Sequence, residues 1–168
     1  MMANDNLKTE TEERELIIER IFDAPPRVMF DMWSDCKHLK HWWGPKEWPM
    51  DECNMDFRVD GKWHFCLRGP NEGDESWGIA TYREISRPDK IVYQDNFSDK
   101  NGNINEEMPG MLVTVEFHDQ NGKTRVASTT LFDTPETRDK VVEMGAVEGM
   151  SSSMDRLDEY LAQRKPFN

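Results

Sequence analysis

The C-terminal stretch from Thr134 to Lys165 constrains the fold most, because it has the pattern of a long amphipathic helix. Thr134 suits a helix N-cap, and Pro135 suits the first helical position. Apolar side chains then recur at alternating spacings of three and four, the helical period. They are Val147, Met150, Met154, Leu157 and Leu161. Burying five such side chains stabilises the fold by on the order of 10 kcal/mol as an upper figure, so we expect the helix to pack against a large apolar sheet.

Small residues interrupt this stretch. Gly145 stands where helix propensity favours alanine, which predicts a short helix from Pro135 to about Met144, a kink, and then the long helix. Gly149 and the serines at 151–153 leave one flank of the long helix without bulk. Such a flank either faces solvent or leaves empty space beside the helix, and the sequence leaves both alternatives open.

The first part of the chain predicts a strand followed by two short helices. Residues 14–22 are rich in isoleucine and leucine between charged neighbours, a pattern typical of a strand. Ala24-Pro25-Pro26 ends this strand and begins a helix that reaches Trp33. Ser34 or Asp35 then caps a second short helix, which ends near Trp42 before Gly44-Pro45.

From residue 50 onward the apolar residues alternate with a period of two, which indicates strands. The first two strands are predicted to form a hairpin around a three-residue loop, Val59-Asp60-Gly61, because this loop matches apolar partners across the pair. The predicted pairs are Phe57 with Trp63, Met55 with Phe65, and Cys53 with Leu67. Trp63, Phe65 and Leu67 then share the face turned toward the long helix.

Four further strands are predicted at 76–86, 90–97, 111–118 and 124–132, with a polar loop over 98–109. The resulting order is one strand, two helices, six antiparallel strands and a terminal helix. This order predicts an α+β fold in which a curved sheet of six to seven strands grips the long helix on one face.

Length and charge limit the possible functions. A chain of 168 residues is the size of one domain, which we expect to span 13–165 after a flexible polar tail at 1–12. Thirty-three acidic against 21 basic residues give a net charge of −12, which disfavours nucleic acid and anionic membranes as partners. Neither a signal peptide nor a membrane-spanning apolar run is present, so a cytoplasmic location is expected.

Cysteine and histidine suggest no metal or redox chemistry. Three cysteines, an odd number, suit reduced thiols, so disulfides are not expected. Cys36, His38 and His41 lie close together on the second predicted helix, and His38 and His41, three apart, could share a face as metal ligands. No fourth ligand is spaced nearby, and a polar surface face is the favoured interpretation. His64 alternates with Trp63 and is expected to face away from the helix. No metal and no cofactor are expected.

Several short segments resemble the SRPBCC or START-like superfamily, and more narrowly the branch related to the activator of the heat-shock chaperone ATPase. They are Ala24-Pro25, Trp42-Trp43-Gly44-Pro45, Met55-Asp56-Phe57-Arg58, Asp60-Gly61-Lys62-Trp63, Pro88-Asp89-Lys90-Ile91, Glu148-Gly149-Met150 and Asp155-Arg156-Leu157. The resemblance covers about residues 14–161 and implies the helix-grip fold. The chain departs from the family pattern at Asp60, where a glycine is usual, and at Met150, where a tryptophan is common.

The resemblance implies three kinds of function. Members of this superfamily enclose a cavity between sheet and helix and typically bind hydrophobic small molecules there. Chaperone-activating relatives use the domain to bind proteins, and others cyclise or hydrate polyketide-type substrates. We therefore expect a small hydrophobic, aromatic ligand as the partner, with a chaperone or a second copy of the chain as alternatives.

Candidate site residues follow from alternation and from the aromatic content. Trp42 and Trp43 cannot both point inward from one turn, so one is expected at a pocket mouth and the other in the core. Trp33, Trp63 and Trp77 are expected in the core. Residues expected to contact a ligand are Trp42, Trp43, Trp63, Phe65, Tyr93, Met150 and Met154.

Asp95 is the candidate catalytic base, with Tyr93 beside it to orient a substrate. Both share a strand face with Ile91 and Phe97, and a carboxylate on a concave apolar face would have a raised pKa. The alternative is a bulge or an early strand end that turns Asp95 to water. No other sequence motif requires catalysis, so the balance is against an enzyme.

Overall fold

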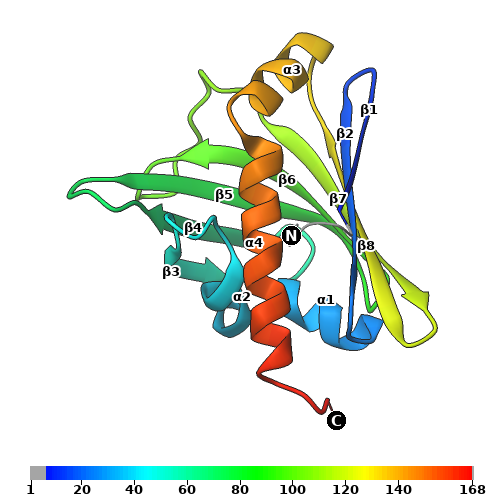
Figure 1. The fold of residues 1–168 in the computed structure, drawn as a ribbon. Coiled ribbons are helices and arrows are strands. Elements are labelled where there is room, and N and C mark those ends of the chain that lie inside the picture. Colours follow the sequence, from blue (N-terminus) through cyan, green and yellow to red (C-terminus); the bar gives the residue numbers. More distant parts are fainter. Residues whose placement is uncertain (1–6, 168) are drawn as a thin grey trace.

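The computed structural model describes residues 7–167 and shows an α+β fold with a curved eight-stranded antiparallel sheet and four helices (Figure 1). The strands are β1 (Lys8–Glu12), β2 (Glu15–Phe22), β3 (Met50–Met55), β4 (Lys62–Arg68), β5 (Glu75–Ser86), β6 (Lys90–Ser98), β7 (Met111–Gln120) and β8 (Lys123–Leu131). The helices are α1 (Pro26–Ser34), α2 (Cys36–Trp42), α3 (Pro135–Glu143) and α4 (Ala146–Ala162).

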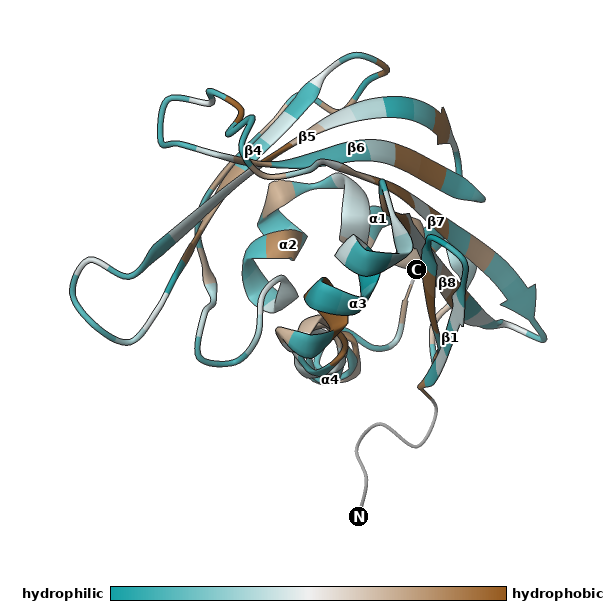
Figure 2. Cartoon of the chain, turned by 90° about the horizontal axis from the view of Figure 1, so that it is seen from above, coloured by the Kyte–Doolittle hydropathy of each residue, from teal (hydrophilic) through white to brown (hydrophobic). Residues whose placement is uncertain are grey.

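The sheet has the order β1-β2-β8-β7-β6-β5-β4-β3, so β3 to β8 form an uninterrupted meander and β2 pairs with β8. Helices α1, α2 and α4 lie within the curve of the sheet (Figure 2). The predicted helix-grip architecture is therefore confirmed. β1 raises the strand number to eight, above the predicted six to seven.

The apolar stripe of α4 faces the core as predicted. Met154, Leu157 and Leu161 are buried, and Val147 and Met150 pack partly buried beside them. Gly145 has φ 96°, a left-handed conformation that favours glycine, and it separates α3 from α4. The predicted break between a short and a long helix is confirmed.

The small-residue flank of α4 faces neither open solvent nor empty space. Ser151 and Ser153 are buried, and the Ser152 hydroxyl accepts a hydrogen bond of 3.0 Å from the backbone N–H of Lys46. A Cβ at Gly149 would lie 3.5 Å from Pro45 Cγ. The segment that follows α2 thus packs against this flank, which explains why bulky residues are absent there.

Three local predictions are wrong. β3 pairs Met55 with Trp63 and Cys53 with Phe65, two residues away from the predicted register, because the strand ends at Met55 and a longer turn follows. In that turn Asp60 takes φ 68° and donates its backbone N–H to the Tyr82 carbonyl. The two-residue shift keeps the same side chains on the same face.

The predicted flexible tail is the second error. Residues 8–12 form β1, which pairs with β2 along its whole length, and all five are exposed. Sequence alternation gives no signal for a strand that buries neither face. Residues 1–6 of the predicted tail lie outside the described residues.

The third error concerns the cysteines. Cys36 and Cys53 form a disulfide between the start of α2 and β3, and Cys66 remains a buried free thiol. The odd number of cysteines hid the bridge, because the two partners meet only when α2 packs against β3.

Tryptophan placement agrees with expectation at two of three core positions. Trp33 and Trp63 are buried, whereas Trp77 is only partly buried and stacks on His64 with 4.9 Å between ring centroids. His64 Nε2 lies 2.9 Å from the Asp99 carbonyl oxygen, so this pair is covered by the loop after β6. No helix among residues 7–167 is long and apolar enough to cross a membrane.

Candidate functional site

Two small, mainly apolar cavities lie against the sheet, and residues of the helices line only the inner one. The inner cavity has a volume of about 100 Å³ and the outer cavity about 170 Å³. The inner cavity is lined by Trp33, Trp43, Tyr93, Asp95, Met111, Val113, Ser128, Thr130, Met150 and Met154. The outer cavity is lined by Trp43, Phe65, Leu67, Ser76, Trp77, Gly78, Asp95, Asn96, Phe97 and Met111.

Trp43, Asp95 and Met111 line both cavities and so form the wall between them. Met111 and Asp95 are opposite each other across the β6–β7 ladder. A methionine has three rotatable side-chain bonds and adapts to irregular space, so Met111 is the most adaptable of these three wall residues.

The end of α2 places the two adjacent tryptophans differently. Trp42 is fully buried and donates its indole N–H to the Met32 carbonyl at 3.1 Å. Trp43 leaves the helix in an extended conformation and lies edge-on to Trp63, with ring centroids 5.0 Å apart. Arg156 of α4 holds the turn from the other side by donating to the Gly44 carbonyl at 2.7 Å.

Asp95 lies in the regular part of β6, paired with Ala80 of β5 and Met111 of β7. No bulge or early strand end turns it to water. Burial raises the pKa of the Asp95 carboxyl to about 7, and a hydrogen bond from the Asn96 backbone partly opposes this rise. A carboxyl with this pKa changes its charge near neutral pH.

Tyr93 lies two residues before Asp95 on the same strand face and lines the inner cavity. Burial raises the pKa of Tyr93 well above its usual value, and the charge of Asp95 raises it further. The phenol therefore stays protonated near neutral pH and provides a hydroxyl beside the carboxyl.

The structure brings most of the predicted ligand-contact residues to the cavities. Trp43, Tyr93, Met150 and Met154 line the inner cavity, and Phe65 lines the outer one. Trp42 and Trp63 line neither cavity and support the wall from behind. The assignment of all seven predicted residues as ligand contacts stays a prediction.

Sequence reasoning missed the part of the wall that β7 and β8 provide. Val113 and Thr130 are register partners, and Ser128 lies two residues away on the same face of β8. Alternation in these strands shows which residues share a face. It does not show that this face lies opposite Trp43 and Met150, because that depends on the curvature of the whole sheet.

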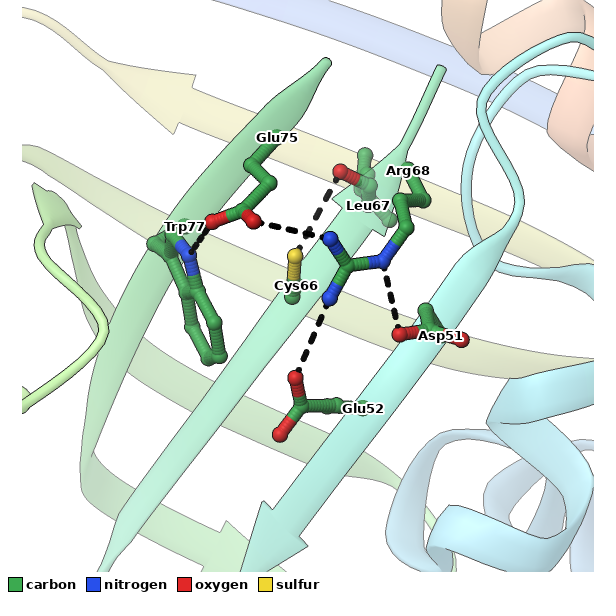
Figure 3. A network of polar contacts seen from close by, with 7 residues as sticks. All are labelled: Asp51, Glu52, Cys66, Leu67, Arg68, Glu75 and Trp77. Atoms are coloured by element: carbon green, nitrogen blue, oxygen red, sulfur yellow. Dashed lines mark hydrogen bonds and ion pairs between the residues drawn. The ribbon is translucent and has the colours of Figure 1, made fainter. Parts of the chain in front are cut away.

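A polar network joins β3, β4 and β5 (Figure 3). Arg68 bonds Asp51 and Glu75, each at 2.8 Å, and also contacts Glu52. Glu75 in turn accepts a hydrogen bond of 2.8 Å from the Trp77 indole. These contacts tie β3, β4 and β5 together. They include Trp77, which also lines the outer cavity.

The histidines near α2 serve packing in the described structure. His38 Nδ1 lies 2.7 Å from the Tyr160 hydroxyl, and the ring of His41 stacks on Tyr160 at 4.6 Å. Burial lowers the pKa of His38, which favours its neutral form. Among residues 7–167, no group of three or more histidine, cysteine, aspartate or glutamate side chains is arranged to hold a metal ion.

Similar solved structures share this fold. A protein from Arthrobacter aurescens is 28% identical, with a TM-score of 0.85 over 94% of this chain and 92% of that one. A protein from Staphylococcus epidermidis is 27% identical, with a TM-score of 0.83 over 96% and 97%. The AHSA1 protein from Silicibacter pomeroyi, at 20% identity, has a TM-score of 0.70 over 89% and 98%, and shows the fold alone.

The family comparison covers most of the chain. No curated protein matches the sequence. The family described as Activator of Hsp90 ATPase homolog 1-like protein matches residues 23–162, which extend from the end of β2 to the end of α4. The chain therefore belongs to the Activator of Hsp90 ATPase homolog 1-like family.

Proposed function

We propose that this protein binds a small, mainly apolar aromatic molecule between the sheet and α4. The observation that carries the proposal is the pair of adjoining cavities with a shared wall of Trp43, Asp95 and Met111. Their walls combine aromatic and methionine side chains with few polar groups, which is the usual composition of a small-molecule site.

The cavity volumes support a ligand of about one ring. Volumes of about 100 and 170 Å³ bracket an engineered cavity of about 150 Å³ that accepts benzene. They lie well below the 300 to 1,000 Å³, roughly, of sites for drug-sized molecules. A single aromatic ring would fill either cavity, and a larger ligand would need Met111 to move.

A thermal-shift titration tests the proposal. Toluene should raise the melting temperature in a concentration-dependent way, because a ligand that binds only the folded state stabilises it by mass action. The matched control is Met150→Trp, which fills the inner cavity with the side chain common in the family. This variant should fold and lose the part of the shift that comes from binding in the inner cavity, because Met150 does not line the outer one. No shift with toluene, phenol or indole in the unaltered protein would contradict the proposal.

An enzyme is the second candidate, favoured by one observation. A general base works best with a pKa near the working pH, and burial raises the pKa of Asp95 to about 7 inside a cavity. Asp95 would then accept a proton from a bound substrate, and Tyr93 would orient that substrate. NMR titration of the Asp95 carboxyl tests this role. A value near 4, the ordinary range for aspartate, would remove the base.

The chaperone-associated alternative rests on the family relationship alone. It predicts a continuous exposed apolar patch and no cavity, and the two cavities therefore favour the small-molecule proposal. An ATPase assay with the chaperone gives a direct comparison. We expect the ATPase rate to stay unchanged when this protein is added.

A further inference from the structure

We propose that Asp95 selects the ligand, and that the site binds single-ring aromatic molecules carrying a hydrogen-bond donor, such as a phenol or an aromatic amine. This inference rests on the proposed function and specifies its ligand class. It predicts discrimination against plain hydrocarbons of the same size and against aromatic carboxylates.

The position of Asp95 is the first argument. It lines both cavities, so a ring in either one can bring a substituent to the carboxyl. The β6 ladder fixes its backbone on both sides, through Ala80 and Met111. A polar group on a rigid strand within a largely apolar wall is the arrangement that orients a small ligand and sets its specificity.

Unused hydrogen-bonding capacity is the second argument. An ionised carboxylate can accept about four hydrogen bonds and can donate none. Within the part of the chain that the structure describes, the Asp95 carboxyl accepts one bond, from the Asn96 backbone, and forms no ion pair. Its remaining acceptor capacity matches a ligand O–H or N–H.

The charge of the cavity walls is the third argument. No lysine, arginine or histidine is among the residues that line either cavity within residues 7–167. Arg156 bonds the carbonyls of Trp43 and Gly44 and lines neither cavity. A ligand carboxylate would therefore meet Asp95 with no cation to neutralise either charge, so aromatic acids are disfavoured.

Among the described residues that line the two cavities, Asp95 is the only group that titrates near neutral pH. On β6 the neighbour is Tyr93, and Tyr82 of β5 adjoins Tyr93; burial raises the pKa of both phenols. β7 presents Met111 and Val113, β8 presents Ser128 and Thr130, and α1, α4 and the segment after α2 present tryptophan and methionine. The preference for a donor should therefore grow as pH rises through the titration of Asp95.

The test compares phenol, toluene and fluorobenzene, which have the same number of heavy atoms. Calorimetry at pH 8 should show phenol binding about tenfold more tightly than toluene, because a hydrogen bond to a charged group is worth more than one between neutral groups. The phenol preference should fall at pH 5, where Asp95 is protonated. Benzoate should not bind measurably at pH 8, where Asp95 and the ligand carboxylate are both ionised.

Three variants decide which residue is responsible. Asp95→Asn should retain toluene binding and lower the phenol-to-toluene ratio at pH 8 to the value that the unaltered protein shows at pH 5, because the amide oxygen still accepts a hydrogen bond but carries no charge. Thr130→Val removes one of the other hydroxyls that line the inner cavity and should leave the ratio unchanged. Glu116→Gln removes an exposed carboxylate on β7 and serves as the charge control.

The outcomes separate the two proposals. If toluene binds and phenol binds no better at pH 8, or if Thr130→Val removes the preference while Asp95→Asn keeps it, the role of Asp95 is overturned and the cavity proposal stands. If none of the probes binds, the cavity proposal is overturned and the inference with it.

Discussion

Asp95 lies in an environment unlike that of an ordinary surface carboxylate, because burial raises its pKa to about 7. It was predictable from alternation with Tyr93, because β6 has no bulge between Tyr93 and Asp95. Its neighbours across the cavity were not predictable, since they come from β7, β8 and the turn after α2. Alternation within a strand shows which of its residues share a face. Contacts between distant segments form only in the assembled sheet.

Replacing Asp95 should stabilise the protein in a pH-dependent way. The folded-state pKa of about 7 lies above the ordinary value of 3.8, so the favourable contribution of protonated Asp95 is complete below pH 4 and is lost as pH rises through 7. An asparagine at this position cannot ionise and would avoid this loss. Asp95→Asn should thus gain up to about 4 kcal/mol over the unaltered protein between pH 4 and 8.

Urea unfolding at several pH values measures this difference. Glu116→Gln provides the control, because it removes one negative charge from a side chain that does not line either cavity. A difference between Asp95→Asn and the unaltered protein that stays constant from pH 4 to pH 8 would show that Asp95 is solvated.

At the scale of elements, the positions of the helices and of every strand except β1 followed from local signals, and the contacts between elements did not. Pro135 and Gly145 mark helix boundaries within the chain itself. The disulfide joins α2 to β3, and the register of the β3–β4 hairpin depends on a turn fixed by Tyr82 of β5. The disulfide depends on how α2 packs against β3, and the register depends on a third strand, β5; no local pattern describes either.

The disulfide should stabilise the attachment of α2, which carries the tryptophan pair. Cys36 and Cys53 are 17 residues apart. Closing a loop of this length stabilises a fold by about 3 kcal/mol, because it lowers the conformational entropy of the unfolded chain. Reductant should therefore lower the melting temperature. The double variant Cys36→Ser, Cys53→Ser should start lower and show no further change. Equal melting temperatures with and without reductant, with the thiols titrated as reduced, would contradict this contribution.

Helix α4 sets the size of the inner cavity through Met154, which is fully buried. Met154→Ala should destabilise the fold by about 2 to 5 kcal/mol and enlarge the cavity. Ligand preference should then move from toluene toward naphthalene. Met144→Ala is the matched control, because Met144 is 73% exposed and should affect neither property. An unchanged preference in Met154→Ala would show that α4 does not limit ligand size.

At the scale of the whole molecule, the sheet curvature and α4 together create the space that the account assigns to a ligand. The aromatic residues do not simply fill it, since Trp43 and Met111 divide it into two small volumes. The fold was predictable from element order and from family resemblance. Cavity size was not, because it depends on how a few large side chains choose among rotamers.

Methyl NMR with toluene tests the central claim most directly. With 13C-labelled methionine methyls, bound toluene should give intermolecular NOEs to Met111, Met150 and Met154, which line the cavities. Met108 and Met144 are exposed and provide internal controls. We expect NOEs to the three cavity methionines and none to the two controls. NOEs confined to Met108 or Met144, or none at saturating toluene, would contradict it.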